Sequence, residues 1–234
     1  MLRSTVVLTA LGITLLSTSS ARAEGLIEPG IGLMGGYGYG FIAKPDHREQ
    51  HPWYPGFAGP TSSFGVALDL RVIKFVGLEV DILKSHYTGS GDFELNGKKV
   101  GETKISHDAT NIPILLKGVF PSPLLAPYAF VGIELVKVSS PSAEFVPEPG
   151  VTLSQRFITG GYADDYQFYT FGVGAEVKLP LPGVDLRVPI SIRGSARSVS
   201  SESSDRVKPD GKDFKIQTEF QYRLTANVGV QYYF

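Results

Sequence analysis

The sequence contains no cysteine, and only one tryptophan occurs among its 234 residues. The absence of cysteine excludes disulfides, thiolate metal sites, a cysteine nucleophile and the lipid-modified cysteine of a lipoprotein. An excess of basic residues is also missing, because 22 Lys and Arg stand against 23 Asp and Glu. This balance gives no electrostatic basis for binding nucleic acid. The stability of the fold must therefore come from packing and from backbone pairing.

Long apolar runs are absent except near the N-terminus. There, Arg3, an apolar core over residues 6–16 and the small-x-small motif Ala21-Arg22-Ala23 predict a secretory signal peptide, residues 1–23. That core is too short for a membrane-spanning helix, so an N-terminal anchor is the weaker interpretation. Because two of the 22 basic residues lie in this segment, cleavage before Glu24 leaves 20 basic against 23 acidic residues. Beyond it, no stretch approaches the ~20 apolar residues of a transmembrane helix.

Apolar and polar residues alternate without a break over the last fifteen residues, 220–234. One face is entirely apolar and consists of Phe220, Tyr222, Leu224, Ala226, Val228, Val230, Tyr232 and Phe234. A period of two predicts a long β-strand with one apolar face. Seven further segments show the same alternation, namely 31–42, 63–72, 78–82, 111–120, 128–138, 171–179 and 186–193.

The connections between these eight segments alternate in length. Long polar connections cover 44–62, 85–108, 139–165 and 200–213, and short ones cover 74–77, 121–127 and 180–183. In outer-membrane barrels the periplasmic turns are short, the extracellular loops are long, and an even strand number returns both termini to the periplasm. We therefore predict an all-β fold, an eight-stranded antiparallel up-and-down transmembrane β-barrel formed by the single domain 24–234. Its expected place is the bacterial outer membrane, with the N- and C-termini periplasmic.

Two of the predicted strands are irregular. Pro113 interrupts the fourth, and in the fifth Tyr128 and Phe130 are out of phase with Val131. A β-bulge near Gly132 would bring the two halves of the fifth strand into one register.

Alternation alone does not say which face meets solvent, because a soluble barrel hides its apolar face inside. Three features favour the membrane. The polar faces of the first and sixth strands are largely Gly and Thr rather than Lys and Glu. Aromatic residues gather at both ends of the last strand, where a bilayer would place its interfacial belts. That strand is also longer than the ~5 or 6 residues of an average soluble strand.

Several segments resemble a known family. These are the signal peptide, Gly36-Tyr37-Gly38-Tyr39-Gly40, Asn111-Ile112-Pro113, Pro127-Tyr128 and the terminal Gln231-Tyr232-Tyr233-Phe234. Together with four long loops, they look like the small outer-membrane β-barrel proteins of Gram-negative bacteria, of the OmpA/OmpX-like or opacity-type "porin family". The resemblance implies that the barrel-assembly machinery reads the last strand as an insertion signal, with Val230, Tyr232 and Phe234 as its key residues. Outer-membrane lipid and lipopolysaccharide are the other partners it implies.

The polar faces carry a balanced set of charges near the short-turn ends of the strands. These residues are Asp69, Arg71, Glu79, Asp81, Lys117, Glu176, Lys178 and Arg187. An eight-stranded barrel is only wide enough for its inward side chains to fill it, and buried charges are tolerated only when paired. We therefore expect a ring of salt bridges that closes this half of the lumen, in preference to a gated, charge-selective path. The small residues Gly36, Gly38, Gly40, Thr170 and Gly172 leave room near the loops for a pocket open to the outside, but a neighbouring tyrosine or Met34 is expected to occupy it.

No catalytic constellation is evident. The four histidines, His47, His51, His86 and His107, lie in or beside the predicted loops, and none is part of a His-x-Ser arrangement. Sequence neighbours on a strand point to opposite faces, so Ser85-His86 and Ser106-His107 cannot readily share a proton. The segment from Asp46 to His51 could supply metal ligands, but a solvated loop is the favoured interpretation. We expect no catalytic residues, no metal and no cofactor.

The predicted function is a structural, adhesive or small-ligand-binding surface role carried by four extracellular loops, without enzymatic activity and with an unknown extracellular ligand. A narrow porin-like channel for small solutes is the alternative, and a lipid A-modifying enzyme comes third. The loop aromatics Trp53, Tyr54 and Phe57 are expected to anchor the barrel at the outer interface rather than to bind a partner.

Overall fold

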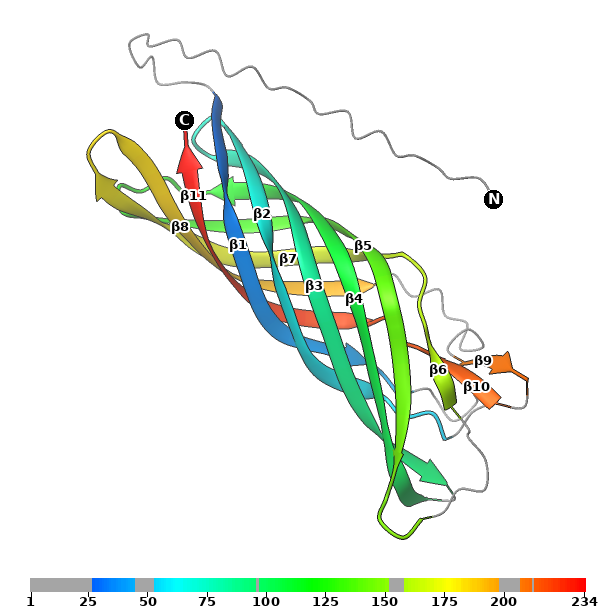
Figure 1. The fold of residues 1–234 in the computed structure, drawn as a ribbon. Coiled ribbons are helices and arrows are strands. Elements are labelled where there is room, and N and C mark those ends of the chain that lie inside the picture. Colours follow the sequence, from blue (N-terminus) through cyan, green and yellow to red (C-terminus); the bar gives the residue numbers. More distant parts are fainter. Residues whose placement is uncertain (1–26, 45–52, 96, 152–157, 198–206, 212) are drawn as a thin grey trace, which may run out of the picture.

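Eight strands form one closed antiparallel barrel, as predicted (Figure 1). The computed structural model describes residues 27–44, 53–95, 97–151, 158–197, 207–211 and 213–234, so the predicted signal peptide lies outside the described residues. The barrel strands are β1 (Ile27–Ile42), β2 (Phe57–Val72), β3 (Val76–Leu95), β4 (Lys98–Val119), β5 (Leu125–Pro147), β7 (Tyr166–Leu181), β8 (Val184–Arg197) and β11 (Tyr222–Tyr233). The ring closes where β1 pairs with β11, from Gly30 opposite Tyr233 to Phe41 opposite Tyr222.

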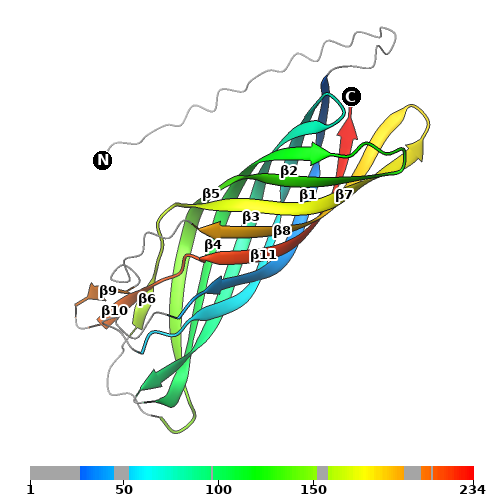
Figure 2. The ribbon, with the colours of Figure 1, turned by 180° about the vertical axis from the view of Figure 1, so that it is seen from behind.

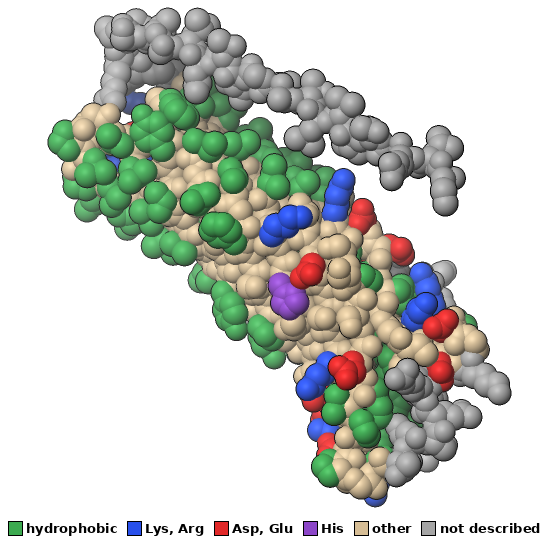
Figure 3. Space-filling model, in the orientation of Figure 1, with side chains coloured by type: hydrophobic (Ala, Val, Ile, Leu, Met, Phe, Trp, Pro, Cys, Tyr) green, Lys and Arg blue, Asp and Glu red, His purple; other side chains and the backbone are tan. Residues whose placement is uncertain are grey.

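The wall of the barrel is apolar outside and polar inside. In β11, Val228 exposes 55% of its surface whereas Asn227 exposes 4%, because successive side chains on a strand point to opposite faces. Apolar side chains cover the outer surface over one end of the molecule (Figure 3). A polar interior inside an apolar wall is stable in lipid, where the sheet pairs every strand edge. The membrane barrel, rather than the soluble one, is therefore confirmed.

The two ends of the barrel differ. At the turn end, short connections join β2 to β3, β4 to β5 and β7 to β8, and Phe234 lies beside the start of β1, where its backbone N–H donates to the carbonyl of Pro29 at 3.0 Å. The turns at Ile73 and Gly183 use positive φ angles of 53° and 75°. At the opposite, loop end, β3, β4 and β5 extend well beyond the other barrel strands (Figure 2). Among the described residues, no helix is long and apolar enough to span a bilayer.

On β2, β3 and β4 the apolar wall stops at definite positions. Their last outward apolar residues before the loop end are Phe64, Ile82 and Ile112. Beyond them the outer wall carries Lys84, His86, Asp108, Thr110 and Lys137. Residues on the loop side of this border lie outside the membrane-spanning part of the barrel.

Strands β3, β4 and β5 are far longer than predicted, with 20, 22 and 23 residues. The polar segment 85–108 is not a loop, because β3 and β4 remain paired from Ser85 opposite Ala109 to Leu95 opposite Lys98. Its outward face is polar, and its inward face mixes Gly, Ser and Thr with Tyr87, Phe93 and Ile105, so no regular apolar period marks it as a strand. Pairing with a neighbouring strand, rather than intrinsic propensity, gives this segment its structure.

The extensions are joined by a small second sheet. Strands β6 (Ile158–Tyr162), β10 (Asp213–Gln217) and β9 (Val207–Asp210) form it, with β6 parallel and β9 antiparallel to β10. It lies at the loop end in both views (Figures 1 and 2). We refer to the extensions of β3, β4 and β5, residues 53–57 and this sheet together as the cap.

The cap has its own apolar core, which corrects the expectation for the loop aromatics. Tyr54 and Phe57 are buried, and Trp53 packs on Phe93 and Phe214 with ring centroids 5.4 and 5.7 Å apart. These aromatic residues do not anchor the barrel in a membrane. Burial of aromatic surface within the cap is the more favourable arrangement, because each ring removes 150–250 Å² from water.

Three details of the strands also differ from expectation. No bulge occurs near Gly132, because β5 pairs in continuous register there with both β4 and β7. Tyr128 and Phe130 simply point into the lumen, while Val131 faces outward. Pro113 does not interrupt β4, which pairs Pro113 with Glu134 of β5. Phe220 precedes β11 and is buried inside the barrel rather than on the lipid-facing wall.

Candidate functional site in the lumen

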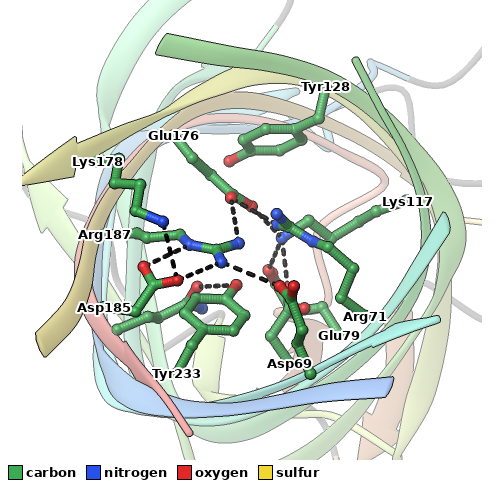
Figure 4. A network of polar contacts seen from close by, with 12 residues as sticks. Asp69, Arg71, Glu79, Lys117, Tyr128, Glu176, Lys178, Asp185, Arg187 and Tyr233 are labelled. Atoms are coloured by element: carbon green, nitrogen blue, oxygen red, sulfur yellow. Dashed lines mark hydrogen bonds and ion pairs between the residues drawn. The ribbon is translucent and has the colours of Figure 1, made fainter. Parts of the chain in front are cut away.

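A buried lysine lies at the centre of the turn-end half of the lumen (Figure 4). The Lys117 ammonium donates to Asp69 Oδ2 at 2.5 Å, Glu79 Oε2 at 2.9 Å and Glu176 Oε1 at 3.2 Å. These carboxylates come from β2, β3 and β7, so one side chain of β4 ties together three other strands. A lysine has three donors and no acceptor, and all three are used here.

Two arginines extend this contact to the rest of the ring. Arg71 Nη2 donates to Glu176 Oε2 at 2.5 Å, and Arg187 Nη1 lies 3.7 Å from the same oxygen. Arg187 also reaches Glu28 at 3.0 Å and Asp185 at 2.7 Å toward the turn end. Because both arginines share Glu176 with Lys117, the charges form one network rather than separate pairs.

On the side of the lumen facing the loops, Arg193 pairs with Asp81 and is a second cation for Glu79. Arg193 Nη2 lies 3.3 Å from Asp81 Oδ2 and 3.4 Å from Glu79 Oε1. Four cations and four carboxylates are thus buried together, namely Arg71, Lys117, Arg187 and Arg193 with Asp69, Glu79, Asp81 and Glu176. Seven of the eight residues predicted for the ring belong to this set. Lys178 does not, since its side chain is about half exposed at the rim and pairs with Asp185 at 3.1 Å.

Aromatic rings fill the space around these charges. The Tyr233 ring centroid lies 3.9 Å from Arg187 Cζ and 5.3 Å from Arg71 Cζ. Tyr128 lies 4.7 Å from the Lys117 ammonium. Cations over aromatic faces gain energy most strongly where water is excluded. The rings therefore stabilise the cations while they occupy lumen volume that would otherwise hold water.

A second, smaller polar layer lies nearer the loop end. Arg223 forms an ion pair with Glu134 and donates to the hydroxyl of Tyr87 at 2.6 Å. Asn111 donates to Glu134 and to the same hydroxyl, each at 2.5 Å. Neither Arg223 nor Glu134 was among the charges predicted to line the lumen, although Glu134 is the acidic residue on the inward face of β5. The out-of-phase aromatic residues of β5 concealed that face.

Neighbouring side chains occupy the space beside the glycines between the two layers. A Cβ at Gly172 would lie 2.3 Å from the Phe130 ring, and one at Gly36 would lie 2.3 Å from Asn227 Oδ1. Met34 is buried beside Ala67 and Leu83. The expected occupants are therefore corrected: Phe130 and Asn227, rather than a tyrosine or Met34, fill the space beside Gly172 and Gly36.

Aromatic side chains fill the interior of the cap, whereas charged side chains fill the turn-end half of the lumen. Phe220 packs against both Tyr87 and His107, and its ring centroid lies 5.7 and 5.9 Å from theirs. His107 stacks on Tyr87 at 4.5 Å. Burial lowers the pKa of His107 to about 4, although a backbone hydrogen bond at Thr218 opposes the shift. Burial likewise raises the pKa of Tyr87 and Tyr166, so all three rings are neutral at pH 7.

The remaining histidines are not in the lumen. His86 lies on the outer wall, where its Nδ1 is 2.7 Å from Asp108 Oδ1. His47 and His51, with the candidate metal segment 46–51, lie outside the described residues. Within the described part of the chain, no group of three or more His, Asp or Glu side chains is arranged to hold a metal ion.

The chain is similar in fold to solved bacterial outer-membrane barrels. No family model and no curated protein sequence matches it. It is 10% identical to the N-terminal β-barrel domain of Pseudomonas aeruginosa OprF, with a TM-score of 0.42 over 88% of this chain and 97% of that one. It is 9% identical to the P. aeruginosa outer membrane protein OprG, with a TM-score of 0.43 over 88% of this chain and 95% of that one.

A third similar structure is that of Ail, the attachment invasion locus protein of Yersinia pestis, in complex with the heparin analogue sucrose octasulfate. It is 11% identical, with a TM-score of 0.38 over 90% of this chain and all of that one. These likenesses concern the fold alone. The chain itself is a closed barrel of eight antiparallel strands.

Proposed function

We propose that this protein is a non-conducting outer-membrane barrel whose lumen is plugged by paired charges and whose cap performs a structural, adhesive or small-ligand-binding role at the cell surface. The observation that carries this proposal is the contact of Lys117 with three carboxylates, at 2.5, 2.9 and 3.2 Å. A passing ion would have to separate charges that are buried and paired with one another. Separating such a group costs several kcal/mol, because each charge would be left without its partner.

Conductance in planar bilayers tests the plug. We expect wild-type protein to give no steady ionic current. Truncation of Arg187 and Tyr233 to serine removes two side chains that fill the turn-end lumen, and we expect this double variant to conduct. Lys178→Ser is the matched control, because Lys178 lies at the half-exposed rim. A steady wild-type current that is abolished by Arg187→Gln or Glu79→Gln would instead support the narrow channel.

The same proposal assigns the turn end to the periplasm and the cap to the outside. In outer-membrane barrels, the short turns and both ends of the chain lie on the periplasmic side. Because the chain has no cysteine, single cysteines give a clean test. We expect a membrane-impermeant maleimide to label Lys98→Cys, at the β3–β4 tip, on intact cells. Labelling of Lys74→Cys, in the β2–β3 turn, should require an opened outer membrane, and the opposite pattern would reverse the assignment.

We further propose that outer-membrane lipid and lipopolysaccharide contact the apolar wall, and that the barrel-assembly machinery reads the end of β11. Val230, Tyr232 and Phe234 form the outward face there, exposed by 47%, 38% and 58%. Phe234→Asp should reduce the folded fraction in cells, as seen from its heat-modifiable migration in gel electrophoresis. If refolding of this variant from denaturant into detergent were equally impaired, the defect would lie in the barrel itself rather than in recognition.

A further inference from the structure

A row of hydroxyl, imidazole and carboxylate side chains crosses the outer wall of β2, β3 and β4. Ser62 pairs with His86 in the β2–β3 register, and His86 pairs with Asp108 in the β3–β4 register. All three side chains are exposed and point outward. In Figure 3 an exposed histidine lies directly beside an acidic side chain on this face. Three strands thus bring together residues that are 24 and 22 positions apart in the chain.

The bond within the row fixes the role of the histidine. His86 Nδ1 lies 2.7 Å from Asp108 Oδ1, the geometry of a donated Nδ1–H bond. When a carboxylate holds the Nδ1 proton in this way, Nε2 is the unprotonated nitrogen of the neutral ring. Directly opposed residues in an antiparallel pair have Cβ atoms about 4.5–5.5 Å apart. Ser62 therefore lies on the other side of His86 from Asp108, within reach of Nε2 after side-chain rotation.

The row lies in a groove at the border of the apolar wall. The groove has a volume of about 510 Å³, and its lining includes Ser62, Phe64, Lys84, His86, Asp108 and Ser139. Phe64 is 61% exposed on its membrane side. Lys84 supplies positive charge next to His86, with its ammonium 2.8 Å from Thr110 Oγ1. An amphiphile could thus place its apolar chain on the wall and its polar group against the row.

The backbone is irregular at this point. The β4–β5 register passes from Ser106 opposite Ser142 to Asp108 opposite Ser139, so β5 carries one extra residue beside Asp108. Ser140, within this bulge, has a φ of 52°. Bulges re-aim the side chains next to them and are over-represented at active sites.

We propose that Ser62, His86 and Asp108 form an esterase site on the outer wall, which acts on fatty acyl esters of lipids in the facing leaflet. Ser62 Oγ attacks the ester carbonyl carbon while His86 Nε2 takes its proton, and the carbonyl electron pair moves onto oxygen beside Lys84. Collapse breaks the ester bond, and the alcohol leaves with the proton from His86. Water then attacks the acyl-serine with His86 as base, which releases the fatty acid and restores Ser62.

Covalent labelling tests the nucleophile. Purified protein in detergent micelles is treated with a fluorophosphonate probe, and the modified peptide is identified by mass spectrometry. We expect modification of Ser62, its loss in Ser62→Ala, and a decrease in labelling rate on the order of 10²-fold or more in His86→Asn and Asp108→Asn. Ser139→Ala is the matched control, because Ser139 lines the same groove but pairs with Asp108 rather than His86; its labelling should equal that of wild type.

Turnover and substrate source are tested in the same samples. We expect hydrolysis of p-nitrophenyl laurate to exceed that of p-nitrophenyl acetate, because the wall beside Phe64 would bind the longer chain. Vesicles of glycerophospholipid alone and vesicles that contain lipid A distinguish the two sources of acyl ester by the fatty acids released. Wild-type protein that is not labelled, or Ser62→Ala protein that is labelled equally, overturns the proposal. Heat-modifiable migration confirms that each variant is folded, and the state of the lumen plug does not affect either result.

Discussion

The two halves of the barrel interior are filled by opposite chemistry. At the turn end, four buried cations meet four buried carboxylates around Lys117. At the loop end, Phe220, Tyr87 and His107 stack in an aromatic core that continues into the cap. One closed sheet surrounds both.

The difference follows from what surrounds each half. The turn-end half lies inside the apolar wall, where inward charges are far from bulk water and must neutralise one another. The cap lies beyond the wall, where water is available outside and burial of aromatic surface stabilises a packed core. Removal of a single charge from the turn-end half should therefore lower the free energy of unfolding by a large amount. In the apolar half, the loss should grow in proportion to the side-chain volume removed.

The largest expected effect comes from breaking the ionic half. Lys117→Met keeps most of the side-chain volume but leaves Asp69, Glu79 and Glu176 without their shared cation. Removal of one partner from a buried ionic group costs ~3–5 kcal/mol. We expect this loss in the free energy of unfolding by urea in lipid vesicles. Lys178→Met, at the half-exposed rim, should change it by less than ~1 kcal/mol; equal losses would contradict the network.

An effect of comparable size, but confined to the cap, is expected from the apolar half. Phe220→Ala removes a fully buried ring from the junction of the lumen and the cap, and such truncations cost ~3–5 kcal/mol when the cavity does not collapse. We expect faster hydrogen exchange in the extensions of β3 and β4, with unchanged exchange around Lys117. Phe220→Leu should give an intermediate result. Uniform exchange throughout the barrel would show that the two halves do not behave independently.

Acid should weaken the cap through His107. The pKa of His107 is about 4 in the folded protein and ~6.5 in the unfolded chain. The unfolded chain therefore binds the proton more tightly, and the free energy of unfolding decreases as the pH falls from above 6.5 toward 4. Between pH 7.5 and pH 5 the loss amounts to ~2 kcal/mol. Limited proteolysis of the cap at both pH values measures it. His107→Gln, which stays neutral, should remove this part of the pH dependence, and an unchanged pH profile would contradict the assignment.

The smallest effect is expected on the surface of the cap. Hydrogen bonds with Asp92 and Glu148 raise the pKa of Lys99, whose side chain is exposed on the surface. Exposed pairs contribute little, because water screens the charges. The thermal midpoint of Lys99→Met should match that of wild type in a melting curve. A clear decrease would indicate that the exposed ion pairs of Lys99 contribute measurably to the stability of the β3–β4 tip.

The sequence was most informative where one face of a strand meets lipid. In β11, the alternation from Tyr222 to Tyr232 predicted the outward face correctly, because every second residue must be apolar there. It failed just before, at Phe220, and in the loop aromatics Trp53, Tyr54 and Phe57. Aromatic residues suit an interfacial belt and a packed core equally well, so their positions depend on contacts with distant segments.

The inward charges were partly predictable for a related reason. Their parity on each strand placed Asp69, Lys117 and Glu176 in the lumen, but Lys178 shares that parity and lies at the exposed rim. Arg193 and Glu134 were missed as partners, although both are inward and charged. Parity gives the side of the wall on which a residue lies, whereas the stagger of neighbouring strands gives its height along the lumen.

The sequence by itself determined the wall: strands of period two, an apolar outer face and short turns at one end, since these depend on neighbours within one segment. Only the tertiary structure decided which distant residues meet, such as Lys117 with Glu176 across 59 positions or Arg71 with Glu176 across 105. It also turned polar segments such as 85–108 into paired strands and arranged Ser62, His86 and Asp108 in one row. The physical reason is that strand register, which no single segment encodes, fixes every contact between strands.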